Sequence, residues 1–134
     1  MIGQLNQEIL DSVLETLPVE FSVIDHEDRV LSWNKHDTRI FKRPKGVVGR
    51  NVRDCHPKKS LDKVKTILGE MKSGKREKAQ FWIDLHIEEK KESQKILIEY
   101  YALRNAEGRY LGCLEVSQNV TEIQKIQGQK RLLD

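Results

Sequence analysis

A cysteine and a histidine stand side by side at Cys55-His56-Pro57, directly before a segment with helical spacing. A neutral imidazole is a good ligand for haem iron or zinc, which makes His56 the sharpest candidate for chemistry in this chain. The alternative is a histidine that starts a helix and hydrogen-bonds a backbone group. Cys55 and the second cysteine, Cys113, would be redox-active if both faced one pocket and one had a lowered pKa. Otherwise they are small buried apolar residues, which is the commoner role of a free cysteine.

The sequence offers no recognisable catalytic set and no closed metal site. Neighbouring side chains diverge, so Cys55 and His56 are poor co-ligands of one zinc ion, and no CxxC or HxxxH pattern supplies further ligands. Asp84 and His86 share one face of an expected strand, but no serine or cysteine nucleophile is placed beside them. Two solvent-facing polar residues explain that pair. We therefore expect a receptor for a small molecule and not an enzyme.

Length and composition indicate one globular domain. The chain has 134 residues, 37% of them hydrophobic, and domains commonly have about 100–150 residues. The 24 basic and 21 acidic residues are interleaved, so no block of one sign recruits nucleic acid. No apolar run approaches the roughly 18 residues of a membrane span, and the acidic, amphipathic N-terminus is neither a signal peptide nor a transit peptide. We expect a cytoplasmic protein without a disulfide framework, and the chain could be one module of a longer protein.

The first third of the chain predicts a helix followed by a hairpin. The helix ends before Pro18, and its apolar stripe recurs every four positions, at Leu5, Ile9, Val13 and Leu17. We expect this stripe to pack across a homodimer, because a single sheet of this size leaves one face to be covered. Residues 19–25 and 30–33 have the pattern of two strands joined by a polar turn. Asn34 is then expected to cap a short helix through Phe41, its side chain accepting a hydrogen bond from a free amide.

A charged helix and a long strand are expected next. Ser60 fits a helix start, and Ser73-Gly74 ends that helix with glycine where a positive φ is wanted. Residues 79–88 alternate apolar and polar side chains, which is the clearest strand pattern in the chain. If Phe81 and Ile83 face a pocket, Trp82 lies on the other side of the strand and faces the flanking helix or a partner subunit.

The last third predicts two strands and a helical segment. The strands, over residues 96–103 and 110–117, flank a turn that ends in Gly108. Residues 119–134 have helical spacing that Gly128 weakens. The expected fold class is α+β, with a five-stranded antiparallel sheet, helices on one face, and flanking N- and C-terminal helices.

These elements, in this order, resemble a PAS domain. The first half of the resemblance is carried by VIDHEDRVLSWNKHDTRIFKRPKGVVGRNV. In the second half, residues 105–112 resemble the last hairpin of the family. Residues 118–122 resemble its closing Asp-Ile-Thr signature, with Asn119 in place of the aspartate, which changes a charge but keeps a side chain that can cap.

A narrower match is to the PAS variant found at the C-terminal end of some hemerythrin-like prokaryotic proteins of unknown function. It is carried by CHPKKS at residues 55–60, by Phe81-Trp82-Ile83 and by residues 115–118. The resemblance covers about residues 10–134. It implies an N-terminal flanking helix, a PAS core and a C-terminal flanking helix, over residues 1–18, 19–118 and 119–134.

The resemblance also implies a pocket between the sheet and the segment from Asn34 to Met71. The candidates for its lining are Trp33, Asn34, Phe41, Cys55, His56, Phe81, Ile83, Tyr100 and Cys113. The implied function is a sensory or regulatory module that binds a small ligand or cofactor and passes a signal through its terminal helices. Two alternatives stay open, a ligand-free module for protein interaction and dimerisation, and a haem sensor that uses His56. PAS domains bind haem, flavin, organic acids, metals or nothing, so the family alone does not choose between them.

Overall fold

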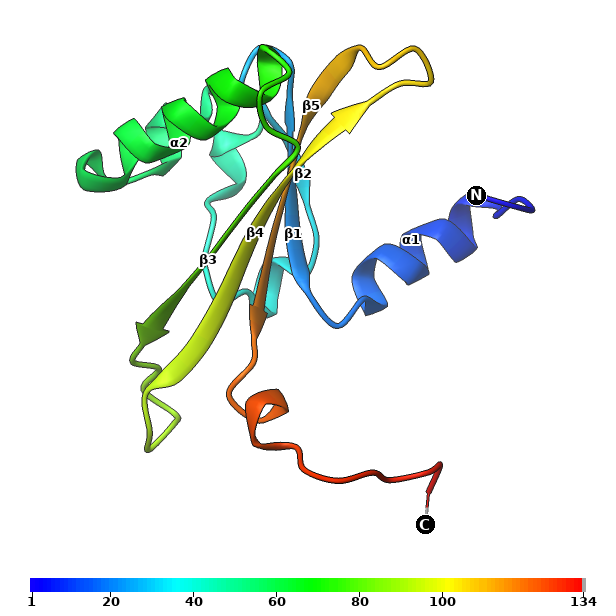
Figure 1. Cartoon of the computed structure of the whole chain (residues 1–134), viewed down its shortest axis with the longest axis vertical. Helices are drawn as coiled ribbons and strands as arrows, with labels where there is room; N and C mark the ends of the chain where they lie inside the picture. Colours follow the sequence, from blue (N-terminus) through cyan, green and yellow to red (C-terminus); the bar gives the residue numbers. More distant parts are fainter. Residues whose placement is uncertain (134) are drawn as a thin grey trace.

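The computed structural model describes residues 1–133, which form a single antiparallel sheet with one long helix packed on one face and a second helix standing apart (Figure 1). The helices are α1 (Gln7–Thr16) and α2 (Lys58–Lys72), and the strands are β1 (Glu20–Asp25), β2 (Val30–Trp33), β3 (Lys78–Leu85), β4 (Gln94–Arg104) and β5 (Tyr110–Asn119). Four short 3-10 turns complete the set, at His36–Thr38, Lys45–Val47, Val52–Cys55 and Ile123–Lys125. Within residues 1–133, no helix is long and apolar enough to cross a membrane.

The five strands follow the order β2-β1-β5-β4-β3, each antiparallel to its neighbours. Successive side chains point to opposite faces, so β5 buries Cys113, Glu115 and Ser117 on the α2 side and leaves Leu114 and Val116 half-buried on the other. The predicted α+β fold with a five-stranded antiparallel sheet is confirmed. The predicted strand limits differ from the observed ones by a few residues at most.

The core lies between the sheet and α2. This helix begins at Lys58, slightly before the predicted start, and buries Val64, Leu68 and Met71 at the spacing of one helical face. It ends before Gly74, whose φ of +81° is the positive value that the sequence predicted. The opposing sheet residues in the same cluster include Ile24, Tyr100 and Cys113.

Gly112 is required by close contact between two strands. A Cβ atom at this position would lie 2.0 Å from the carbonyl oxygen of Ile24 in β1. No side chain can occupy that space while β1 and β5 keep their pairing, so only glycine fits here.

The predicted helix from Asn34 to Phe41 is wrong. Only His36–Thr38 forms a 3-10 turn, and it has no side-chain cap. Asn34 is buried, and its side chain points back to the N-terminal segment. It accepts from the Phe21 amide at 2.7 Å and donates to the Leu14 and Val19 carbonyl oxygens at 2.8 and 3.1 Å. The amide group therefore joins the end of α1 to the start of β1, a long-range role that local spacing does not reveal.

The predicted C-terminal helix is also wrong over the described part, because Asn119 still belongs to β5 and residues 120–133 contain only the 3-10 turn at Ile123–Lys125. Thr121 is buried and accepts a hydrogen bond from the Lys95 amide at 2.8 Å, which holds this segment against β4. Beyond it, Ile123 and Ile126 are 50% and 74% exposed. A short helix without a packing surface is marginal in water, and here the apolar positions have none.

Helix α1 projects away from the sheet and from α2 (Figure 1). Asn6 caps it as the sequence chemistry favours, accepting a hydrogen bond from the Ile9 amide at 2.8 Å. None of its residues is buried. Its end is held by Asn34 and by a hydrogen bond from the Lys35 amide to Glu15.

The turn between β4 and β5 tests how much a positive φ at Gly108 disfavours a side chain. Gly108 has a φ of +83°, and no atom would lie within 4 Å of an added Cβ, so a side chain would meet backbone strain alone. We expect Gly108→Val to lower the free energy of unfolding by about 1–2 kcal/mol, measured by urea denaturation. Gly46→Val is the matched control, because Gly46 has equal space and no positive φ. Equal losses in the two variants would contradict the explanation.

Candidate functional site

A pocket of about 830 Å³ lies between the inner face of the sheet, α2 and the segment that leads into α2. Its apolar wall comes from three places, the segment after the first 3-10 turn, α2, and strands β3 and β4. These residues are Phe41, Val64, Ile67, Phe81, Ile83 and Ile98. The Phe81 and Tyr100 rings meet edge to face with their centroids 5.6 Å apart. Most of the remaining lining is polar, and its charged residues are Arg39, Lys42, Arg43, Lys59, Lys63, Asp84 and Glu115.

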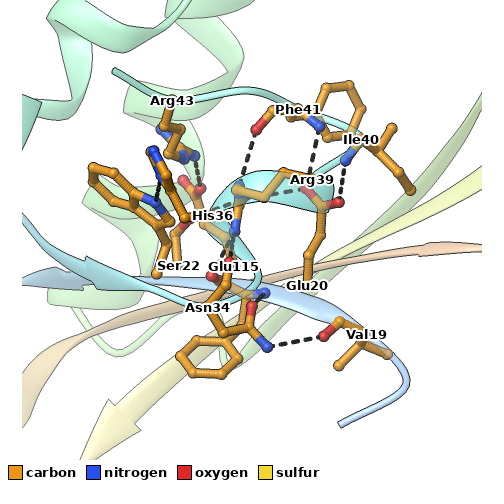
Figure 2. A network of polar contacts seen from close by, with 12 residues as sticks. Val19, Glu20, Ser22, Asn34, His36, Arg39, Ile40, Phe41, Arg43 and Glu115 are labelled. Carbon is orange, nitrogen blue, oxygen red and sulfur yellow. Dashed lines mark hydrogen bonds and ion pairs between the residues drawn. The ribbon is translucent and has the colours of Figure 1, made fainter. Parts of the chain in front are cut away.

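The first charged group in this region is an ion pair between Arg39 and Glu20, both almost fully buried (Figure 2). Arg39 Nη2 lies 3.2 Å from Glu20 Oε2. The other guanidinium nitrogens donate to the carbonyl oxygens of Phe21, Asn34 and Phe41. Glu20 in turn accepts from the backbone amides at positions 40 and 41. Burial lowers the pKa of Arg39, and the Glu20 carboxylate opposes that shift. The pair ties the segment after β2 to the start of β1.

The second ion pair joins Arg43 to Glu115 and lies directly at the pocket. Arg43 Nη2 is 2.8 Å from Glu115 Oε2, and the side chains are only 11% and 8% exposed. Burial raises the pKa of Glu115, and the charges of Arg43 and Arg39 oppose the shift. Arg43 Nε and Glu115 Oε1 are buried without a hydrogen-bond partner in the described residues. Unlike the first pair, this one leaves a donor and an acceptor free.

His56 lines the pocket and is anchored from behind. Its Nδ1 lies 3.0 Å from the Val52 carbonyl oxygen. A carbonyl can only accept, so Nδ1 carries the proton, and Nε2 keeps its lone pair in the neutral ring. The same anchoring by a backbone carbonyl is common for histidines that bind metals. It is also the backbone hydrogen bond expected of a histidine with a purely structural role.

The two cysteines have different places, and neither has the lowered pKa that redox activity would need. Cys55 lines the pocket beside Arg43, but burial raises the pKa of its thiol. Cys113 is fully buried in the core, and burial raises its pKa to about 12. Both are thiols at neutral pH, which favours the structural role for each.

The structure brings together six of the nine pocket candidates proposed from the sequence. The residues that line the pocket are Phe41, Cys55, His56, Phe81, Ile83 and Tyr100. Trp33, Asn34 and Cys113 are not among the lining residues. Trp33 packs at the edge of the core and its ring nitrogen donates to His36 at 2.9 Å. Asn34 is turned toward α1, and Cys113 lies in the buried core, opposite Ile24 in the strand register.

The charged lining residues were missed in the sequence. Arg39, Arg43 and Glu115 stand among many other charged residues, and in a chain with 34% charged residues most such side chains face water. One signal was present for Glu115. It alternates with Cys113 and Ser117 on one face of a strand, which places it on the buried side whenever Cys113 is buried.

Metal binding by protein ligands alone has little support in the described part of the chain. Residues 1–133 contain no group of three or more histidine, cysteine, aspartate or glutamate side chains placed to hold a metal ion. A haem iron needs only an axial ligand from the protein, and the free Nε2 of His56 meets that requirement.

The chain belongs to the PAS domain family, whose model matches residues 10–121. This class of domain is sensory and generally not catalytic. A C-terminal domain from Streptococcus mutans is 30% identical, with 95% of this chain and 94% of that one covered and a TM-score of 0.83. The PAS domain of Bordetella pertussis BvgS is 16% identical over 88% of each chain, with a TM-score of 0.63.

A third similar structure is a sensory box sensor histidine kinase from Vibrio cholerae. It is 15% identical, with 90% of this chain and 93% of that chain covered and a TM-score of 0.59. At such identities the likeness is one of fold. No curated protein matches the sequence significantly.

The role of His56 can be tested in the absence of any known ligand. Replacing His56 by Ala removes the hydrogen bond to Val52, and we expect a loss of about 1 kcal/mol in the free energy of unfolding. Both proteins are also incubated with hemin and their absorption spectra compared. A Soret band of specifically bound haem that His56→Ala abolishes would make His56 the axial ligand. Equal spectra would remove it as a ligand and leave the structural role.

Proposed function

We propose that this PAS domain is a sensor that binds a small molecule between the sheet and α2. The observation that carries the proposal is the pocket itself, whose volume of about 830 Å³ lies within the range of roughly 300–1,000 Å³ common for small-molecule sites. Its apolar wall and its few buried polar groups match the usual composition of such sites. The alternative of a ligand-free interaction module expects a pocket filled by the side chains of the protein, so the open volume supports the sensor.

A route for the signal follows from the elements that the pocket touches. Glu115 and Ser117 lie on β5, which runs directly into the C-terminal segment after Asn119. Arg39 fixes the opposite side of the pocket to β1, next to the contact between Asn34 and the end of α1. A ligand that prefers one arrangement of these contacts would shift the population of both terminal segments.

Filling the pocket tests the sensor function. Ile98 faces the pocket from β4, and its neighbour Leu97 faces the other side of the same strand. We expect Ile98→Phe to remove a co-purifying small molecule that native mass spectrometry detects on the wild type, because the added ring occupies ligand volume. Leu97→Phe is the matched control and keeps the molecule. Retention by both variants would contradict the proposed site. A wild type that carries no molecule, and binds none from a metabolite extract, would favour the ligand-free interaction module.

We further propose that α1 pairs with a second copy of the chain. The apolar stripe is open to solvent, with Leu5, Ile9 and Val13 exposed by 43%, 49% and 41%. The outer face of the sheet also carries half-buried apolar side chains and the 63% exposed Trp82. A symmetric dimer places the same helix and sheet face of each copy against the other, so one interface would cover both surfaces.

Charge placed on the stripe tests the dimer. We expect the wild type to be a dimer at micromolar concentration by light scattering, and Ile9→Glu combined with Val13→Glu to be monomeric, because two carboxylates would be buried at the interface. Gln4→Glu combined with Gln7→Glu adds the same charge at exposed polar positions just before and at the start of α1, away from the apolar stripe, and should remain dimeric. A wild type that is a strict monomer would contradict the proposal.

A further inference from the structure

The charged residues that line the pocket do not balance one another in sign. Both carboxylates of the lining already have a cationic partner within the protein, because Glu115 pairs with Arg43 and Asp84 pairs with Lys95 of β4. Arg39 has its own buried carboxylate partner at the start of β1. The charges that are left without a partner at the pocket are therefore those of its lysines.

Three lysines line the pocket, and all of them are exposed to solvent. They are Lys42, Lys59 and Lys63. None of the three has an ion-pair partner among residues 1–133. Lys42 donates a hydrogen bond to the carbonyl oxygen of Asp37 at 3.2 Å, which carries no full charge. The uncompensated charge of the pocket is positive, and it lies on the part of the lining that water reaches.

Helix α2 places two of these lysines beside part of the apolar wall. Lys59 and Lys63 are one helical turn apart, and Val64 and Ile67 line the same pocket from the same side of the helix. The stem of a lysine can lie along apolar surface while its ammonium group stays in water. A molecule whose body lies against Val64 and Ile67 can therefore have one end close to the ammonium groups.

From this arrangement we infer that the ligand is an amphiphilic anion, a carboxylic acid whose apolar body lies in the pocket and whose carboxylate lies beside the three lysines. This inference rests on the proposed sensor function and names the class of molecule that the sensor detects. Burial of the body is favoured because it removes nonpolar surface from water. The carboxylate remains at the exposed rim, so its charge is not transferred into the protein interior.

The buried part of the lining determines which way the molecule points. Glu115 lies there with its side chain 8% exposed, next to the almost fully buried Tyr100. A ligand carboxylate beside Glu115 would add a second negative charge where little water can screen it, which is costly. The apolar end of the ligand is therefore expected to be innermost, against Phe81 and Ile98.

The test uses three probes that share one alkyl chain and differ in the charge of the end group. Octanoate is the anion, octanol is neutral and octylammonium is the cation. Each is titrated at neutral pH into ¹⁵N-labelled protein, and the backbone amide signals of the pocket residues Ile83 and Ile98 are followed by NMR. We expect octanoate to bind about tenfold more tightly than octylammonium and about threefold more tightly than octanol, because the lysines attract the anion and repel the cation. Sodium chloride at about 1 M should remove most of this preference, since exposed charges are then screened within roughly 3 Å.

A pair of double variants shows whether the preference comes from the pocket. Lys59→Gln combined with Lys63→Gln removes two of the three lining charges, and the preference for octanoate over octylammonium should fall to about threefold or less. Lys58→Gln combined with Lys65→Gln removes the same charge from exposed positions of α2 outside the lining and should keep the tenfold preference. All four lysines are exposed, so neither variant removes core packing.

The outcomes separate this inference from the proposed function. Binding of octanol or octylammonium that equals or exceeds that of octanoate, with shifts at the pocket amides, would overturn the anionic class and leave the sensor function standing. Equal losses of preference in the two double variants would overturn it as well, because the attraction would then come from the net charge of the helix. If none of the probes shifts the pocket signals at millimolar concentration, the ligand class is overturned, and native mass spectrometry of the wild type then decides the sensor function by itself.

Discussion

The buried ion pair between Arg39 and Glu20 is the interaction on which the rest of the site depends. It fixes an otherwise irregular segment to β1 through one charged contact and through hydrogen bonds to backbone groups on both sides (Figure 2). Nε and Nη1 of Arg39 donate to backbone carbonyl oxygens, Nη2 also donates to Ser22 Oγ, and both Glu20 oxygens accept backbone amides. Removing either charge would leave the other buried without a partner, which is among the most costly changes in a protein core.

The two buried ion pairs of this domain differ in how fully the protein satisfies their hydrogen bonds. Arg39 and Glu20 are satisfied by the protein itself, so they hold the wall of the pocket in place. Arg43 and Glu115 line the pocket, and each has one buried atom without a hydrogen-bond partner among the described residues.

The sequence was most informative where structure is local. Alternation of apolar and polar residues placed the strands, and a glycine with a positive φ marked the turns at Gly74 and Gly108. The order of these elements was enough to identify the family. The sequence failed at Asn34 and at residues 119–133 because its patterns there are compatible with a helix, whereas the actual partners are distant. Asn34 bonds to α1, and Thr121 bonds to β4.

The sequence by itself determined the strands, the long helix and the side of the sheet that faces the core, because these follow from the periodicity of neighbouring side chains. It also indicated that His56 would lie near the pocket. Only the tertiary structure decided that Arg43 meets Glu115, since 72 positions separate them. Pairing of two charges across such a distance depends on the packing of the whole sheet. A sequence with 34% charged residues contains many possible pairs of opposite charge. Only the folded structure shows which of these pairs is buried.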